Sequence, residues 1–179
     1  RDSLYRLLGD RPGNYRILPV NGTMRQPVHT ACARVGDVLY FLTGGGMYYF
    51  DGQTVQRKTD AEKVRELVGG ANLSACCAAV CRERLYFALR ESAGEGPNDA
   101  ILVYDLDRGT YMVRRGFSAN GISAAGGTLY LLDGNGYVCR FDEGDTYDGA
   151  RIDAYWKTPM ADLDAKSVSK RLEELYLRG

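Results

Sequence analysis

The stretch GDVLYFLTGGGMYYFDGQTV, residues 36–55, decides the fold, and near its start lies the triplet Leu39-Tyr40-Phe41. The triplet returns as Leu85-Tyr86-Phe87 and, with one change, as Leu129-Tyr130-Leu131. Counted between the tyrosines at 40, 86 and 130, the intervals are 46 and 44 residues. Near-equal intervals of this length indicate a repeated structural unit.

The three triplets have matching surroundings. A turn precedes each one (residues 36–37, 82–83 and 126–127), and a run of small residues precedes each turn: HTACARV, SACCAAV and GISAA. After each triplet an aromatic segment ends in aspartate, at Asp51, Asp105 and Asp142. A further segment then has strand character: GQTVQRK, DRGTYMVRR and GARIDAYWKT. Each unit is therefore expected to contain four strands.

The middle unit is longer than the other two. Its aspartate lies 19 residues after the tyrosine, against 11 and 12 in the other units. The excess of eight is the length of SAGEGPND, Ser92 to Asp99, a polar Gly/Pro segment typical of an extended hairpin loop. Without this loop the three units share one spacing.

A period of about 45 residues with four strands per unit is typical of β-propeller blades. We therefore predict an all-β fold of propeller-like blades, each with four antiparallel strands, over residues 28–159. The blades are expected at about 28–58, 73–116 and 121–159. Such a sheet buries both faces only by stacking on its neighbours. A generic antiparallel sandwich built of hairpins is the alternative fold.

One segment, TDAEKVRELVGG at residues 59–70, has helical spacing instead. Val64, Leu67 and Val68 fall on one helical face. Asp60 is placed to cap the start of the helix, and Gly69 is placed to end it. We predict a helix over residues 60–69, inserted between the first two blades, with its apolar face against the sheets.

Two terminal segments flank the blades. Residues 1–27 contain one turn signal, Arg11-Pro12-Gly13, and one expected strand, Tyr15 to Val20, which together suit a partial blade. Residues 160–179 form a C-terminal extension in which SVSKRLEELYLRG fits either a helix or a strand. Three blades do not close a ring. Further blades from the termini, chain outside this piece, or oligomerisation would complete the ring. The missing N-terminal methionine favours completion by chain outside this piece.

Composition excludes several classes of function. The 23 basic and 23 acidic side chains balance, so no overall field attracts nucleic acid or anionic lipid. Residues 1–60 carry 8 basic and 5 acidic side chains, and residues 121–179 carry 7 and 10. The chain has no apolar run long enough to cross a bilayer, and the residues from Arg1 onward lack the hydrophobic stretch expected of a signal peptide. Five cysteines, an odd number, indicate free thiols and a reducing compartment.

The cysteines and the single histidine are the first candidates for chemistry. Cys76, Cys77 and Cys81 have the spacing C-C-x-x-x-C, which is not that of a zinc knuckle. In ACCAAVC they are expected to pack as small apolar residues. His29 is the only histidine, so a catalytic triad or Cys-His pair would depend on it alone. A strand position or a turn contact is the simpler interpretation.

Three further features are candidate sites. The run Gly44-Gly45-Gly46 lies between two strands, so it is expected to form a hairpin turn and not a phosphate loop. Residues 133–136 (DGNG) are expected to form another hairpin turn. The acidic loop FDEGDTYDG offers Asp142, Glu143, Asp145 and Asp148 to calcium, without the calcium-loop spacing. Trp156 would anchor a binding surface if exposed and belongs to the core otherwise. We predict no catalytic, cofactor-binding or metal-binding residue.

The order of these segments resembles the propeller-type structural proteins of tailed bacteriophages and prophages, among them tail, tail-nozzle and head-completion components. The likeness runs from LYFLTGGGMYYFDGQTV through ILVYDLDRGTY to a closing segment, and covers roughly residues 28–177. The closing matches are Asp148-Gly149, Ile152, Ala154, Trp156, Thr158-Pro159 and Lys170; Tyr111 stands where the group often has tryptophan. The resemblance implies virion assembly without an enzymatic site, and a β element at SKRLEELYL.

Three functions follow as hypotheses. The first is a non-enzymatic structural and assembly protein that contacts other virion proteins or copies of itself, located in the virion or in the bacterial cytoplasm during assembly. The second is a binding module of the kelch or NHL sort that recognises a host protein or glycan. The third is an enzyme, since propellers also carry hydrolases and lyases. The sequence does not indicate a membrane as a partner. It does not indicate nucleic acid either, because the basic residues are scattered and form no continuous patch.

Overall fold

The computed structural model describes residues 4–20, 27–59, 61–92, 94–147 and 149–152. Strands make up 63% of these residues, and the one helix among them, α1, spans Glu62–Gly70. Every strand pairing in this part of the chain is antiparallel. The prediction of an antiparallel β fold with one inserted short helix is therefore confirmed.

The strands form four sheets, each joined in chain order. The first is the hairpin of β1 (Leu4–Leu8) and β2 (Arg16–Val20). The second holds β3 (Pro27–Val35), β4 (Val38–Thr43), β5 (Gly46–Phe50) and β6 (Val55–Arg57). The third holds β7 (Asn72–Cys81), β8 (Arg84–Arg90), β9 (Asn98–Asp105), β10 (Thr110–Ala125), β11 (Thr128–Asp133) and β12 (Val138–Phe141). The last is a short hairpin of β13 (Thr146–Tyr147) and β14 (Ala150–Arg151).

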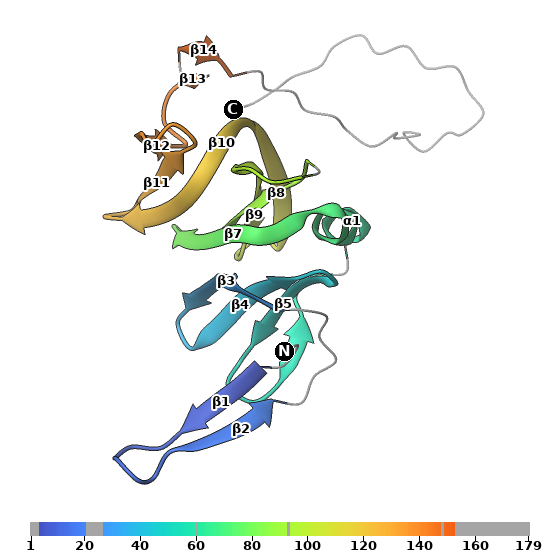
Figure 1. The fold of residues 1–179 in the computed structure, drawn as a ribbon, viewed down its shortest axis with the longest axis vertical. Helices are drawn as coiled ribbons and strands as arrows, with labels where there is room; N and C mark the ends of the chain where they lie inside the picture. The colour runs from blue at the N-terminus through green and yellow to red at the C-terminus, as the bar shows by residue number, and fades with distance from the viewer. Residues whose placement is uncertain (1–3, 21–26, 60, 93, 148, 153–179) are drawn as a thin grey trace, which may run out of the picture.

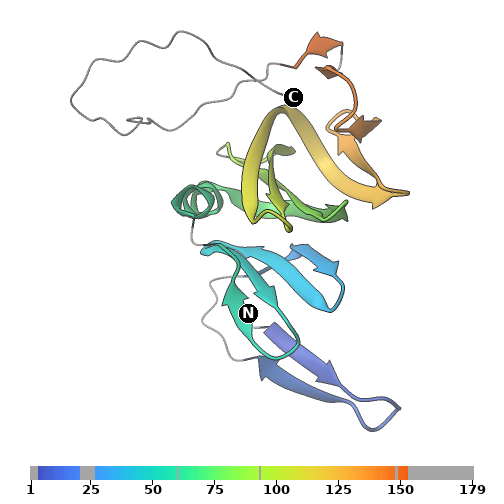
Figure 2. The same cartoon turned by 180° about the vertical axis from the view of Figure 1, so that it is seen from behind.

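These sheets follow one another along the long axis of the molecule (Figure 1). The β1–β2 hairpin lies at one end, the β3–β6 sheet comes next, and α1 with β7–β9 follows. The far part of β10 then leads to β11 and β12, and Figure 2 shows the same order from behind. The arrangement is a stack of sheets in which each layer has two faces to bury.

The layer made by β7, β8 and β9 is apolar on both faces. In β8, Leu85, Phe87 and Leu89 contribute to a first core shared with the β3–β6 sheet and α1. Tyr86 and Ala88, which alternate with them, contribute to a second core shared with β10 and β11. Because neighbouring residues in a strand point to opposite faces, a continuous apolar run is what a strand covered on both sides requires.

The three repeated triplets occupy equivalent positions in their hairpins. Each tyrosine pairs with a small residue of the preceding strand: Tyr40 with Ala33, Tyr86 with Ala79, and Tyr130 with Ser123. The leucine before each tyrosine pairs with an aromatic residue of the following strand: Leu39 with Phe50, Leu85 with Tyr104, and Leu129 with Phe141. The turns at 36–37, 82–83 and 126–127 therefore set the same register three times.

The strand β10 differs from the prediction. Its first part, residues 110–115, pairs with β9, and its last part, residues 121–125, pairs with β11. The register shifts between these parts, where Gly116 has a φ of +92° that side-chain-bearing residues rarely adopt. This bend carries one strand from one layer to the next (Figure 1). Separate four-stranded blades over 73–116 and 121–159 are therefore not confirmed, since β7–β12 form one curled sheet.

The third predicted unit also lacks its expected fourth strand beside β12 within the described residues. Ala150 and Arg151, from the segment GARIDAYWKT, pair with β13 in the small hairpin. Residues 153–158 of that segment lie outside the described residues, as does the extension over 160–179. The closing matches Ala154, Trp156, Thr158-Pro159 and Lys170 are therefore not described. The choice between core and surface for Trp156 stays a prediction.

The helix and the N-terminal segment follow the sequence pattern closely. Val64, Leu67 and Val68 are the buried residues of α1, as the spacing predicts. The helix starts at Glu62, with Ala61 as its N-cap, and continues through Gly69, its predicted end, to Gly70. The Ala61 backbone N–H donates to the Thr59 side chain at 3.2 Å, and Asp60 lies outside the described residues. The expected strand at 15–20 is β2, and the Arg11-Pro12-Gly13 turn joins it to β1. Within the described residues, no helix has the length and apolar character to span a membrane.

We expect Phe87→Ala to lower the free energy of unfolding by about 3 to 5 kcal/mol, because Phe87 is completely buried in the first core. Met112→Ala, which removes an exposed side chain from β10, is the matched control and should cost less than about 1 kcal/mol. Urea unfolding followed by circular dichroism measures both. Equal losses for the two variants would contradict the central place of this layer.

Candidate functional site

A cluster of charged and hydroxyl side chains joins β12 to the layer beneath it. It contains Arg84 and Tyr86 of β8, Asp105 of β9, Arg114 of β10, and Asp142 directly after β12. We call these five residues the polar cluster. The Arg84 guanidinium donates to Asp105 at 3.2 Å, and the Tyr86 hydroxyl donates to Asp142 at 3.4 Å. The Arg114 guanidinium donates to the other oxygen of Asp142 and lies over the Phe141 ring.

The electrostatics of the polar cluster favour fixed charges over proton transfer. Burial raises the pKa of the Tyr86 phenol, and the negative charge of Asp142 raises it further. Hydrogen bonds, first from the backbone N–H of Arg108 and then from Arg84, hold the pKa of Asp105 below its usual range. The hydrogen bond to Asp105 raises the pKa of Arg84. The cluster is therefore suited to hold β12 in place near neutral pH.

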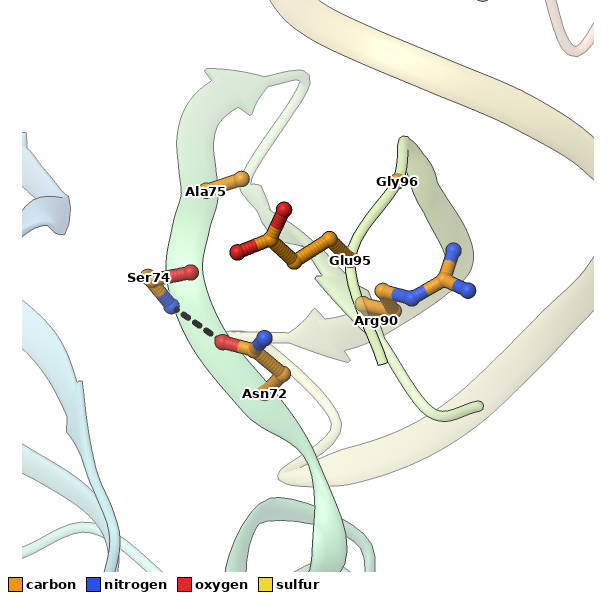
Figure 3. A pocket seen from close by; sticks show the side chains of 6 residues that line it. All are labelled: Asn72, Ser74, Ala75, Arg90, Glu95 and Gly96. Carbon is orange, nitrogen blue, oxygen red and sulfur yellow. Dashed lines mark hydrogen bonds between the residues drawn. The ribbon is translucent and has the colours of Figure 1, made fainter. Parts of the chain in front are cut away.

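A small open cavity of about 250 Å³ lies between β7 and the β8–β9 loop (Figure 3). It is lined by Asn72, Ser74, Ala75, Arg90, Glu95 and Gly96. The Glu95 side chain extends from the loop towards β7 (Figure 3). A carboxylate in this position can accept hydrogen bonds from the hydroxyl or ammonium groups of a small polar ligand.

Most other polar groups of this cavity hold the loop together. The Arg90 guanidinium donates to the carbonyl of Gly94 at 3.1 Å and to that of Pro97 at 2.9 Å. Asn72 donates to the Gly94 carbonyl at 3.3 Å and accepts from the backbone N–H of Ser74 at 3.0 Å. The cavity wall is thus preorganised by side chains that already have partners.

Two further contacts fix the start of the same loop. The Asp99 carboxylate accepts hydrogen bonds from the backbone N–H groups of Glu91, at 2.6 Å, and Ser92, at 3.2 Å. The Arg115 guanidinium donates to both oxygens of Glu91, at 2.5 and 2.8 Å. The extended hairpin loop expected from SAGEGPND is thus anchored at both ends, with Asn98 and Asp99 already in β9.

Lys58 lies among three tyrosine rings from two sheets. Its ammonium is 5.6 Å from the ring centre of Tyr40, 5.7 Å from that of Tyr49, and 5.7 Å from that of Tyr104. Burial raises the pKa of Tyr40 and of Tyr104, so these rings are neutral at physiological pH. Aromatic rings around a cation form the arrangement that recognises ammonium ligands. Here the chain's own lysine occupies it and links β4 and β5 to β9.

The cysteine and histidine candidates lie apart from these features. Cys76 belongs to the first core and Cys81 to the second, as expected for cysteines that pack as apolar residues. Burial strongly raises the pKa of the Cys76 thiol. His29 is an exposed residue of β3 whose carbonyl accepts a hydrogen bond from Cys32. Within the described residues, no group of three or more His, Cys, Asp or Glu is arranged to hold a metal ion.

The acidic loop has partners within the protein. Asp142 adopts a φ of +67° and binds Arg114 and Tyr86, as described above. Glu143 pairs with Arg140 at 3.2 Å. Asp148 lies outside the described residues. Two of the four carboxylates proposed for calcium therefore already have arginine partners. The predicted hairpin turns at 44–46 and 133–136 join β4 to β5 and β11 to β12.

Sequence reasoning missed Lys58 and the pair of Arg114 with Asp142. The aligned units contained part of the signal, because Tyr86 is the triplet tyrosine of the second unit and Asp142 is the closing aspartate of the third. The contacts themselves depend on how the layers stack, which the repeat did not specify. Lys58 directly follows β6 and ends the aligned segment GQTVQRK, but the segment alone does not show which rings its side chain reaches.

No protein-family model matches the sequence, and comparison with curated proteins finds no significant relative. The function therefore has to be inferred from the residues and their packing.

We expect Lys58→Met to lower the free energy of unfolding by about 1 kcal/mol, because it removes the cation from the three rings while keeping a long apolar side chain. Lys63→Met, at an exposed position of α1, removes the same charge without a ring contact and should have little effect. Thermal unfolding of both variants measures the difference. A loss as large for Lys63→Met would show that charge alone, and not the aromatic contact, is responsible.

The pair of Glu91 with Arg115 predicts a dependence of stability on pH. The hydrogen bonds from Arg115 hold the pKa of Glu91 below its usual range of about 4.3. A group with a lowered folded pKa contributes stability above its unfolded pKa and loses this contribution as the pH falls through the folded value. The pair is partly exposed, so we expect Glu91→Gln to cost about 0.5 to 1 kcal/mol at neutral pH.

The difference between wild type and Glu91→Gln should shrink towards zero as the pH falls from about 5 to about 3. Urea unfolding at several pH values measures it. Glu95→Gln, at an exposed carboxylate of the same loop, is the control for the general effect of removing a negative charge. A difference for Glu91→Gln that stays constant over this range would contradict the assignment.

Proposed function

We propose that this chain is a non-enzymatic structural and assembly protein of a phage or prophage virion, in which propeller-like β units form a rigid scaffold for contacts between subunits. The observation that carries the proposal is the layer β7–β9, which is apolar on both faces. The β3–β6 sheet covers one face, and the curled part of the same sheet, β10 and β11, covers the other. Layers stacked in this way use most of their side chains for packing. Such a body presents loops and end faces in fixed positions, as an assembly component requires.

The equivalent registers of the three hairpins support a propeller-like repeat within this scaffold. The tyrosines at 40, 86 and 130 each pair with a small residue of the preceding strand. In each case that preceding strand, β3, β7 or β10, also has a register shift before the hairpin. A bulge at a matching place in three strands is a feature that repeated units would share.

The resemblance of the sequence to propeller-type proteins of tailed phages gives the proposal its biological setting. On this view the partners are other virion proteins or copies of the same chain, and the protein is located in the virion or in the bacterial cytoplasm during assembly. The polar cluster serves the scaffold, because its arginine and carboxylate groups join β8, β9 and β10 to the end of β12.

A second candidate is a binding module of the kelch or NHL sort. The cavity beside the β8–β9 loop favours it, because Glu95 reaches into an open space with a preorganised wall. A glycan array should then show saturable binding that Glu95→Gln abolishes and Glu66→Gln, on the exposed face of α1, leaves intact. Without such binding this candidate fails, and the structural role is unaffected.

The virion role predicts that the chain is a component of assembled particles. Particles released after prophage induction should contain it in a fixed ratio to the capsid protein, measured by quantitative mass spectrometry after density-gradient purification. Its gene should lie beside genes for portal, capsid or tape-measure proteins. A chain that is abundant in the lysate and absent from the purified particles would contradict a virion component.

A further inference from the structure

The layers of this protein stack in one direction. We call the side of a hairpin that carries the repeated tyrosine its Tyr face, and the opposite side its Leu face. The Tyr face of the β3–β6 sheet, with Tyr40 and Leu42, packs in the first core on the Leu face of β8, with Leu85 and Phe87. In the second core, the Tyr face of β8 packs on the Leu face of β11, with Leu129 and Leu131. Each Tyr face is thus covered by the next Leu face.

The last Tyr face has no such cover from the described residues. Its apolar side chains are Tyr130, Leu132 and Val138. Leu132 pairs in register with Val138 between β11 and β12, and Tyr130 pairs with Arg140, which lies on the same face. Tyr130 is half-buried, while Leu132 is 40% exposed and Val138 is 69% exposed. We call these three residues the C-terminal face. It carries the repeated tyrosine, as the two buried faces do, but Arg140 lies opposite this tyrosine where the buried faces have Tyr49 and Val103.

The opposite end of the stack exposes a second apolar face. Leu4 of β1 packs against the cluster of Phe41 and Tyr48, on the Leu side of the β3–β6 sheet. The other side of the hairpin carries Tyr5, Leu7 and Ile17, which are 61%, 63% and 70% exposed. Leu7 and Ile17 pair directly in register. We call Tyr5, Leu7 and Ile17 the N-terminal face. In the order of the stack, it lies on the side of its hairpin where each of the other sheets has its Leu face.

The net charges of the two ends are opposite. Residues 4–20 carry three arginines and one aspartate, which gives the N-terminal hairpin a net charge of +2. Residues 119–147 carry four carboxylates and one arginine, which gives the other end a net charge of −3. Arg6 and Arg16 lie on the opposite side of the hairpin from Leu7 and Ile17. The opposite net charges of the two ends therefore favour their encounter at longer range and do not form charged rims around the faces.

We propose that a second copy of this chain covers the C-terminal face with its N-terminal face, so that the stacking found within one chain continues between chains. The proposal rests on the scaffold role proposed above and names the partner. A contact between two different patches is heterologous, so it leaves one patch of each kind open and builds a ring or a longer assembly. Apolar side chains exposed together on a sheet face are the usual mark of such interfaces.

Two single variants disable one face each. Ile17→Asp places a carboxylate on the N-terminal face, and Val138→Asp places one on the C-terminal face. Both positions are strongly exposed, so the fold should survive, which circular dichroism and thermal unfolding verify. Each substitution should raise the dissociation constant for self-association more than about tenfold. Met112→Asp, at an exposed position of β10 outside both faces, is the matched control and should associate like wild type.

Mixing the two variants gives the decisive result. Sedimentation velocity of the purified full chain at micromolar concentration should show oligomers for wild type and monomers for each variant alone. The mixture should form 1:1 dimers that grow no further, because Ile17→Asp retains its C-terminal face and Val138→Asp its N-terminal face. Monomeric wild type would overturn the proposal and point to another occupant of these faces. A mixture that stays monomeric, or single variants that still associate, would also overturn it.

These results are independent of the virion role. A chain found in purified particles that is monomeric alone would keep the scaffold function and reject the second copy as the partner. A chain that assembles as described but is absent from particles would keep the contact and reject the virion.

Discussion

The burial of both faces of the β7–β9 layer is the constraint on which the rest of the structure depends. A strand whose side chains are apolar on both sides is unstable with either side in water, so this layer requires a sheet above it and a sheet below it. Leu85 and Phe87 need the β3–β6 sheet and α1, while Tyr86 and Ala88 need β10 and β11. The order of the layers along the molecule follows from that requirement.

The polar contacts lie where the layers have to be joined. Lys58, at the end of β6, reaches the rings of Tyr40 and Tyr49 in its own sheet and that of Tyr104 in the next. Asp142, after β12, performs a similar function for the second core through Tyr86 and Arg114. Apolar contact between sheets is not directional, so neighbouring sheets can slide. A cation or carboxylate with partners in both layers fixes their alignment.

The sequence predicted the local elements better than their connection. The two-residue turns, the small residues opposite each tyrosine and the apolar face of α1 all follow from local spacing, which depends on neighbours along the chain. The continuity of β10 does not follow from local spacing. The prediction ended one blade at about 116 and began the next at about 121, because it divided the chain into repeated units. In the structure the strand bends there and continues, since both parts find a partner strand in their own layer. The contacts of Lys58 and Arg114 were missed for a related reason, because they depend on the order of layers and not on any local pattern.

The direction of stacking gives the molecule two unlike ends. Within the chain a Tyr face always meets a Leu face, because small residues such as Ala33 and Ala79 lie beside the tyrosine and let the next sheet approach. A finite stack built by this rule necessarily exposes one face of each kind, whatever its number of layers. The side chains left at the ends are then suited to each other, since the ends continue a contact that the interior already makes. Under the proposed scaffold role, assembly requires no separate sequence motif, because the chemistry of the ends is set by the same alternation that folds the middle.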